Sequence, residues 1–177
     1  YWPETMAEVM ALRNMVIELS AARLCSHVNF HPVNLYDYMP EVKLSIAALA
    51  DANFSCTLYL EPDLPIVEFD PQLIKQALLN LIKNAYEAME KHGTIHLVVT
   101  STAKSVQLHV IDHGGGLDPA LGNTIYQPFV TTKTGGSGLG LAITKQIMES
   151  HHGTLTCESR KGDGCTFTLT LPRTQAP

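Results

Sequence analysis

A glycine-dense loop that runs directly into an apolar, helix-forming segment constrains this chain more than any other feature. Residues 133–141 read Lys-Thr-Gly-Gly-Ser-Gly-Leu-Gly-Leu. Glycine lets backbone N–H groups approach a ligand closely, and the start of a helix offers unpaired donors and partial positive charge. The loop matches neither G-x-x-x-x-G-K-[ST] nor G-x-G-x-x-G. It therefore predicts an anion site at a helix N-terminus, suited to phosphate, without naming the ligand.

The composition is typical of a single soluble domain. The chain has 177 residues, of which 45% are hydrophobic and 16% charged, enough to bury a full core. The net charge of -5 argues against nucleic acid as the main partner, because neutralising phosphates requires clustered Lys and Arg. The four cysteines lack C-x-x-C spacing, so zinc is not indicated. Cys157 and Cys165 could face each other across a hairpin, and two free thiols are the favoured state.

Hydrophobic periodicity predicts helices and strands in mixed order. Residues 1–24 predict a helix whose apolar spacing fits either a coiled-coil seam or an ordinary packed helix. The remaining expected elements follow in chain order: an extended piece at 30–35, a helix opened by Asp37 and Pro40, strands at 56–60 and 66–69, a long helix from Asp70 to Gly93, a hairpin of 94–100 and 106–112, a helix at 138–150, and a hairpin of 154–158 and 166–171. Antiparallel neighbours favour an α/β (α+β) two-layer sandwich over a parallel sheet.

Two amides lie on one edge of the long predicted helix. Asn80 and Asn84 are four residues apart, so they point in nearly the same direction, with Glu87 beside them. An amide oxygen is a neutral, hard ligand that suits Mg²⁺, and an amide NH₂ can donate to phosphate. Amides at a core edge also commonly make local hydrogen bonds. Taken alone, this pattern favours the structural alternative.

An aspartate ends the strand that precedes the glycine-rich region. Asp112 follows an apolar strand and is followed by His-Gly-Gly-Gly. An ionised carboxylate only accepts hydrogen bonds, so it can bind an exocyclic amine such as that of adenine. A strand that simply ends in a glycine turn is an equally good explanation. The connection over residues 113–137 is long, and connections of this length inside a domain are usually functional.

Together, these segments resemble the motifs of sensor histidine kinases. In chain order, residues 80–85 (Asn-Leu-Ile-Lys-Asn-Ala) resemble the N box, 112–116 the first glycine box, 128–133 (Pro-Phe-Val-Thr-Thr-Lys) the F box, 136–141 the second glycine box, and 162–167 (Gly-Asp-Gly-Cys-Thr-Phe) the third. The residue sequences of these motifs are most similar to those of the nitrogen-regulation and metal-response branch of the family. The resemblance implies a Bergerat-type (GHKL) ATP-binding fold, with a mixed, mostly antiparallel sheet packed on three helices.

The resemblance also implies roles for individual residues. Asp112 would bind the adenine amine, Asn84 would coordinate Mg²⁺, and Asn80 would be the catalytic residue near the γ-phosphate. Phe129 would anchor a lid over 117–134, and Thr166 would lie close to the adenine. The full implied ATP-binding set draws on all five motifs: Asn80, Lys83, Asn84, Glu87, Asp112, Gly114, Gly116, Leu117, Phe129, Thr131, Thr132, Lys133, Gly136, Ser137, Gly138, Leu139, Gly140, Leu141 and Thr166.

The chain departs from the family pattern in two places. Glu87 stands where many members carry Lys or Arg, which puts a cationic phosphate contact in doubt. The first predicted helix also lacks a phosphoacceptor histidine followed by an acidic residue. We therefore expect residues 1–28 to be the remnant of the second helix of a dimerisation hairpin, 29–174 the catalytic domain, and 175–177 a tail.

The expected function is ATP-dependent phosphorylation of a histidine, with ATP and Mg²⁺ as cofactors. The implied partners are the histidine-bearing dimerisation domain of the same kinase, a second copy in a homodimer, and a response regulator receiver domain. Neither nucleic acid nor direct membrane contact is implied, and the location is cytoplasmic. Related ATPases and serine kinases carry Glu at the position of Asn80, because a base must deprotonate their nucleophile, whereas an amide cannot. A nucleotide-binding interaction module and an ATPase are the alternatives.

Overall fold

The computed structural model describes Val9, Leu12, Arg23 and residues 26–48, 53–128, 130 and 138–174. The helix expected over residues 1–24 therefore lies outside the described residues, apart from three of its positions. In the described part of the chain, no helix combines the length and apolar character needed to cross a membrane.

A five-stranded sheet forms one layer of the molecule. Its strands lie in the order β2 (Phe54–Leu60), β4 (Gly93–Ser101), β5 (Ser105–Asp112), β7 (Gly164–Pro172) and β6 (Thr154–Arg160). The β2–β4 pair is parallel and the other three pairs are antiparallel. A second, two-stranded sheet joins β1 (His31–Val33) to β3 (Val67–Phe69). The expected mixed, mostly antiparallel sheet is confirmed.

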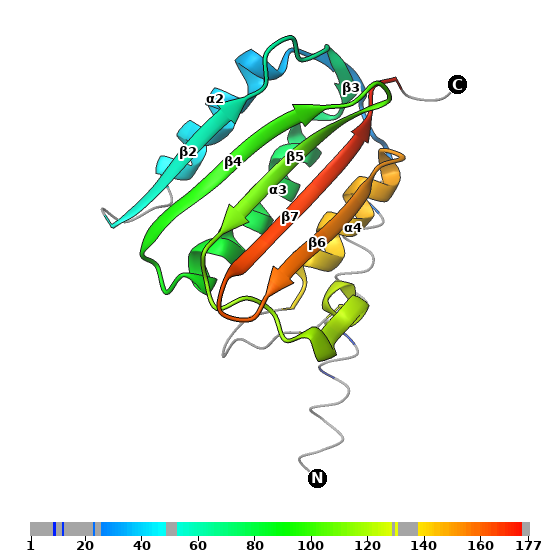
Figure 1. Ribbon diagram of the computed structural model, residues 1–177. Helices are drawn as coiled ribbons and strands as arrows, with labels where there is room; N and C mark the ends of the chain where they lie inside the picture. Colours follow the sequence, from blue (N-terminus) through cyan, green and yellow to red (C-terminus); the bar gives the residue numbers. More distant parts are fainter. Residues whose placement is uncertain are drawn as a thin grey trace.

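Three α-helices form the second layer and cover one face of the sheet (Figure 1). They are α2 (Leu35–Ala47), α3 (Pro71–Ala88) and α4 (Gly140–Ser150). The sheet alternates buried and less buried residues, as in β5, where Val106, Leu108 and Val110 are at most 1% exposed. These side chains form a core with the apolar face of α3. The expected two-layer fold with three helices is thus confirmed.

Two expected helix boundaries are wrong, one at the start of α2 and one at the end of α3. The second helix begins at Leu35, ahead of Asp37 and Pro40, because the Asn34 side chain accepts a hydrogen bond from Tyr36 N–H at 3.0 Å. The long helix begins after Asp70, as expected, but ends at Ala88. Gly93 is instead the first residue of β4, and its φ of 101° is one that glycine adopts readily.

A buried histidine joins the far end of α4 to the start of α3. The His151 side chain is fully buried, and its Nε2 accepts a hydrogen bond from Asp70 N–H at 3.0 Å. Its Nδ1 donates to the carbonyl of Ile147 at 2.7 Å, and its ring packs edge-on against Phe30, with centroids 5.4 Å apart. The Asp70 carboxylate in turn accepts from Asn29 N–H at 3.0 Å. This cluster ties the segment before β1 to both helices.

Stability should fall on mild acidification because of His151. Burial is the main cause that lowers the pKa of His151 below its usual value. The unfolded chain therefore takes up a proton at His151 more readily than the folded chain. The contribution of neutral His151 to the free energy of unfolding is complete above about pH 6.5 and is lost as the pH falls toward the folded-state pKa. We expect urea unfolding to give a lower free energy of unfolding at about pH 5.5 than at about pH 7.5.

Two variants separate His151 from other acid-sensitive groups. His151→Asn keeps a donor near the position of Nδ1, but its shorter side chain does not reach the position of Nε2, so Asp70 N–H loses its acceptor. The variant should lose about 1–3 kcal/mol at neutral pH and respond less to acidification. His92→Asn is the matched control, because His92 is exposed and is not among the groups that shift the pKa of His151. An unchanged pH dependence in His151→Asn would contradict the assignment.

Candidate functional site

The first turn of α4 lies against the middle of α3. Asn80 is half-buried on α3, and its Nδ2 is 3.4 Å from the carbonyl oxygen of Gly140 and 3.5 Å from Thr144 Oγ1. A Cβ on Gly140 would lie only 3.8 Å from that of Asn80. Leu139 occupies the N-cap position of α4 and makes no side-chain cap hydrogen bond, and Gly138 before it has a φ of 68°. Among the described residues, the backbone donors of this turn therefore have no side-chain cap.

A buried carboxylate marks the end of β5. Asp112 is 4% exposed, and its Oδ1 accepts hydrogen bonds from Gly114 N–H at 2.9 Å and Cys165 N–H at 3.3 Å. These bonds fix the carboxylate from both sides, one from its own loop and one from β7. Both of these bonds use Oδ1, and an ionised carboxylate has a second oxygen that can accept from another donor.

The loop after β5 is held between α3 and the β6–β7 turn at distances that exclude side chains. A Cβ on Gly114 would lie 2.7 Å from the carbonyl oxygen of Ala88, at the end of α3. A Cβ on Gly116, where φ is 71°, would lie 2.1 Å from the carbonyl oxygen of Arg160. The Gly162 N–H also donates to the carbonyl of Gly115 at 2.8 Å. The first and third glycine motifs are therefore packed against each other.

One face of α3 connects these two regions. Asn80, Asn84 and Ala88 recur every four residues, so they line the same side of the helix. The Asn80 end of this line contacts Gly140, and the Ala88 end contacts the Gly114 loop. Asn84, which is half-buried, lies between them. We call this line, with the contacts at its two ends, the candidate site.

The other residues of the sequence-derived set are placed unevenly. Glu87 is half-buried on α3, and Lys83 is exposed. Leu117, Leu139 and Leu141 are half-buried, and Leu117 N–H donates to Ser159 Oγ at 2.8 Å. The remaining members lie outside the described residues: Phe129, Thr131, Thr132, Lys133, Gly136 and Ser137.

Thr166, expected from the resemblance to lie close to the adenine, is not the residue of β7 that lies opposite Asp112. Thr166 pairs with Ile111 in the ladder, whereas Cys165 pairs with Asp112. Because side chains alternate along a strand, Cys165 shares the helix-covered face with Asp112 and Thr166 points to the opposite face. Sequence reasoning missed Cys165. The signal was present, since Cys165 continues the apolar frame of Phe167, Leu169 and Leu171.

The long glycine-rich connection contains a short 3-10 helix. A 3-10 helix, η1 (Pro119–Tyr126), begins after Asp118, whose Oδ1 accepts from Ala120 N–H at 2.9 Å. It buries Ile125 and places the Tyr126 ring 5.8 Å from Lys145 Nζ on α4. Burial raises the pKa of Tyr126 above its usual value. Figure 1 shows η1 beside the lower end of β6.

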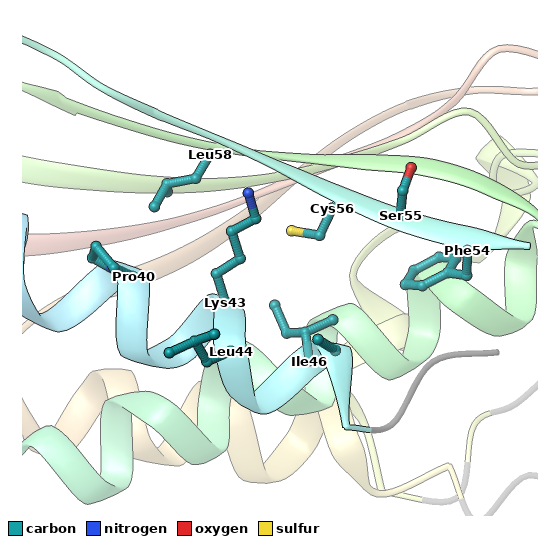
Figure 2. Close-up of a pocket in the computed structure, with 9 residues that line it drawn as sticks. Pro40, Lys43, Leu44, Ile46, Phe54, Ser55, Cys56 and Leu58 are labelled. Carbon is teal, nitrogen blue, oxygen red and sulfur yellow. The ribbon is translucent and has the colours of Figure 1, made fainter. Parts of the chain in front are cut away.

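The hollow shown in Figure 2 is separate from the candidate site. It lies between α2 and the edge strand β2, with apolar walls that include Leu44 and Leu58. Lys43 and Cys56 also line it, and burial raises the pKa of Cys56 to about 11. None of the ATP-binding residues that the resemblance implies lines this hollow.

Among the described residues, no group of three or more His, Cys, Asp or Glu side chains could hold a metal ion. The oxygen of the Asn84 amide is a hard, neutral ligand that fits Mg²⁺, an ion that usually takes only one or two protein ligands beside substrate phosphates. The donor set thus fits magnesium only together with a phosphate ligand.

Comparison with known proteins places the chain in a family. The family model described as histidine kinase-, DNA gyrase B-, and HSP90-like ATPase matches residues 69–175. Sensor histidine kinase ZraS of Escherichia coli K12 is 41% identical over 109 residues, which cover 62% of this chain and 23% of ZraS. Sporulation kinase A of Bacillus subtilis is 36% identical over 143 residues, which cover 80% of this chain and 23% of that kinase. The chain thus spans about a quarter of the length of these relatives.

Solved structures give the same result. The catalytic domain of histidine kinase ThkA superposes with a TM-score of 0.75 at 32% identity, covering 83% of this chain and 97% of that domain. Full-length ShkA in complex with AMPPNP has a TM-score of 0.77 at 24% identity, covering 98% of this chain and 40% of ShkA, a likeness that shows the fold alone. The resemblance found in the five motifs is confirmed. This chain therefore belongs to the family of histidine kinase-, DNA gyrase B- and HSP90-like ATPases, in the branch of the sensor histidine kinases.

Proposed function

We propose that this chain binds Mg-ATP and transfers the γ-phosphate to a histidine on a dimerisation domain, for relay to an aspartate of a response regulator. The observation that carries the proposal is the line of Asn80, Asn84 and Ala88 on α3. It connects an uncapped helix start at Gly140 to a glycine loop beside a buried carboxylate. A nucleotide needs these two ends, one for phosphate and one for the base.

The base would bind at Asp112. Oδ2 is not used by the two backbone bonds, so it can accept a hydrogen bond from the adenine amino group. Gly114 and Gly116 would leave room for a flat ring against the backbone, and Leu117 would supply an apolar contact. Cys165, rather than Thr166, would lie next to the base, because it shares the face of Asp112.

The phosphates would bind at the start of α4. The N–H groups of Gly138, Leu139 and Gly140 belong to a helix N-terminus that has no side-chain cap among the described residues, which suits an anion. Asn84 would hold Mg²⁺, which neutralises phosphate charge when bound. The other expected contacts remain part of the proposal: Lys83, Glu87, Phe129, Thr131, Thr132, Lys133, Gly136, Ser137 and Leu141.

The residue at the γ-phosphate end favours transfer over hydrolysis. Asn80 carries an amide, which cannot remove a proton from water at neutral pH. An imidazole nitrogen needs less activation, so positioning and electrostatic stabilisation can suffice. Within this proposal, residues 1–28 belong to the dimerisation hairpin, 29–174 form the catalytic domain and 175–177 are a tail. The histidine that receives the phosphate lies on the dimerisation domain of the same kinase, which forms a homodimer.

Transfer can be tested by mixing the chain with a separate dimerisation hairpin, Mg²⁺ and γ-labelled ATP. The proposal expects acid-labile label on the hairpin, and no label on a hairpin whose histidine is replaced by glutamine. Phosphate release without an acceptor would support the ATPase instead. ATP binding with neither outcome would support an interaction module.

Asp112→Asn should weaken ATP binding by about tenfold. Asparagine keeps an oxygen for the two backbone donors, so the loop should stay in place, but its NH₂ cannot accept from the adenine amine. Calorimetric titration with Mg-ATP measures the change. Asp163→Asn, at an exposed position in the β6–β7 turn, is the control of equal charge change. An affinity for Asp112→Asn equal to that of the control would contradict the base site.

A further inference from the structure

Two thiols lie side by side on the inner face of the β6–β7 hairpin. Cys165 on β7 pairs with Ser159 on β6, and Cys157 on β6 pairs with Phe167 on β7. The two cysteines are therefore diagonal neighbours on one face, a separation that long or polarisable side chains can span. Both are free thiols.

Cys165 is also part of the wall that holds Asp112. Its N–H donates to Asp112 Oδ1 at 3.3 Å, and its Sγ lies 3.2 Å from Ser159 Oγ. The Ser159 hydroxyl in turn accepts from Leu117 N–H, in the loop after β5. An atom added to the sulfur of Cys165 would thus enter space shared by the carboxylate and this loop.

The surroundings lower the pKa of Cys165 and raise the pKa of Cys157, so Cys165 is the nucleophile and Cys157 stays protonated. The hydrogen bond from Cys157 is the main cause that lowers the pKa of Cys165 to about 7, against burial and the charge of Asp112. The same bond, with burial, raises the pKa of Cys157. The thiolate is the reactive form of cysteine, so Cys165 is the more reactive of the pair at neutral pH.

We propose that Cys165 is an oxidisable thiol at the base end of the candidate site, and that its oxidation to sulfenic acid by a hydroperoxide prevents ATP binding. This proposal rests on the proposed function, because it needs the base to lie beside Asp112. It adds regulation of that site by the oxidation state of the Cys165 sulfur. Cys157, the neighbouring thiol, keeps its proton.

The reaction balances without any group beyond the hydroperoxide and water. The Cys165 thiolate attacks the terminal hydroxyl oxygen, so an S–O bond forms and the O–O bond breaks. Sulfur loses two electrons, and the alkoxide that leaves takes a proton from water to become an alcohol. A thiol reductant reverses the change in two steps, first releasing water and then the Cys165 thiol with a disulfide of the reductant.

The oxidised sulfur would compete with the base in two ways. Its oxygen takes up room beside Asp112, on the face that Cys165 and Asp112 share. The sulfenic hydroxyl is also a donor, so it can bond to the carboxylate oxygen that the adenine amine would otherwise use. ATP bound first should cover Cys165 and slow its oxidation.

The experiment follows each cysteine of the whole chain by peptide mass spectrometry during treatment with hydrogen peroxide and dimedone, which traps sulfenic acids. Cys165 should be labelled at least about tenfold faster than Cys56, the thiol whose pKa is raised to about 11. Mg-ATP should slow this labelling. Cys157→Ala, which removes the hydrogen bond, should slow it as well. Equal rates at Cys165 and Cys56, or no protection by Mg-ATP, would overturn the proposal.

Calorimetry separates this proposal from the proposed function. Peroxide should weaken Mg-ATP binding by about tenfold or more, a reductant should restore it, and peroxide should not change the affinity of Cys165→Ser. If the reduced protein binds no Mg-ATP, the proposed function fails. If the reduced protein binds Mg-ATP and the oxidised protein binds it equally well, only the thiol proposal fails.

Discussion

Replacing Asn80 with alanine should lower the rate of phosphoryl transfer to histidine by about 100-fold. In the proposed function, the Asn80 amide lies at the γ-phosphate end of the site and stabilises charge that develops during transfer. A positioned donor of this kind typically contributes such a factor. The loss should appear in the rate constant at saturating ATP, because the base and the other phosphate contacts remain.

The same substitution should cost the fold little. The contacts from Asn80 Nδ2 to Gly140 and Thr144 are long, at 3.4 and 3.5 Å. The carbonyl of Gly140 keeps a shorter hydrogen bond from Thr144 Oγ1, at 2.7 Å. Asn80→Ala therefore leaves no acceptor unpaired there, and urea unfolding should change by less than about 1 kcal/mol.

Gln76→Ala is the matched control for Asn80→Ala. Gln76 carries an amide on the same helix, one turn earlier, and is also half-buried. It lies farther from the first turn of α4, so its loss should leave transfer nearly unchanged. Equal rates in Asn80→Ala and the unmodified chain would remove Asn80 from the catalytic role. A large loss in both variants would instead indicate a general effect on α3.

Strand alternation and helix capping made much of this fold predictable. The hairpin strands were predictable because apolar and polar residues alternate along them. Asp70 followed by Pro71 indicated the start of α3. The end of α3 was not predictable, because Glu90 and Lys91 adopt positive φ values that residue type does not favour. Gly93 was therefore taken as the helix end, although it begins β4.

The motifs identified the family, but their spacing did not show which face of a strand each side chain occupies or which distant residues are in contact. Thr166 was assigned a role from the motif and Cys165 was not, although Cys165 lies opposite Asp112 in the ladder and shares the buried face of Phe167. The cluster of His151, Asp70 and Phe30 joins positions far apart in sequence, so no local pattern indicated it. Asn80 and Gly140 were both singled out, yet only the fold shows that they touch.

Gly116→Ala should destabilise the chain by several kcal/mol, the largest effect on stability expected of any substitution proposed for it. The new Cβ would lie 2.1 Å from the carbonyl oxygen of Arg160, at a φ of 71° that alanine rarely adopts. Backbone lies on both sides of this contact, so no flexible side chain can move away. We expect about 1–2 kcal/mol from the left-handed conformation alone, and more from the displaced β6–β7 turn.

Gly115→Ala, one residue earlier, is the control that isolates the close approach. A Cβ at Gly115 meets nothing within 4 Å, and its carbonyl can still accept from Gly162 N–H. Urea unfolding should therefore place Gly115→Ala within about 0.5 kcal/mol of the unmodified chain. Where Gly116→Ala still folds, its affinity for Mg-ATP should fall, since the loop that orients Asp112 is displaced. Equal stability of the two variants would show that the first and third glycine motifs do not pack as closely as the backbone of Gly116 and Arg160 indicates.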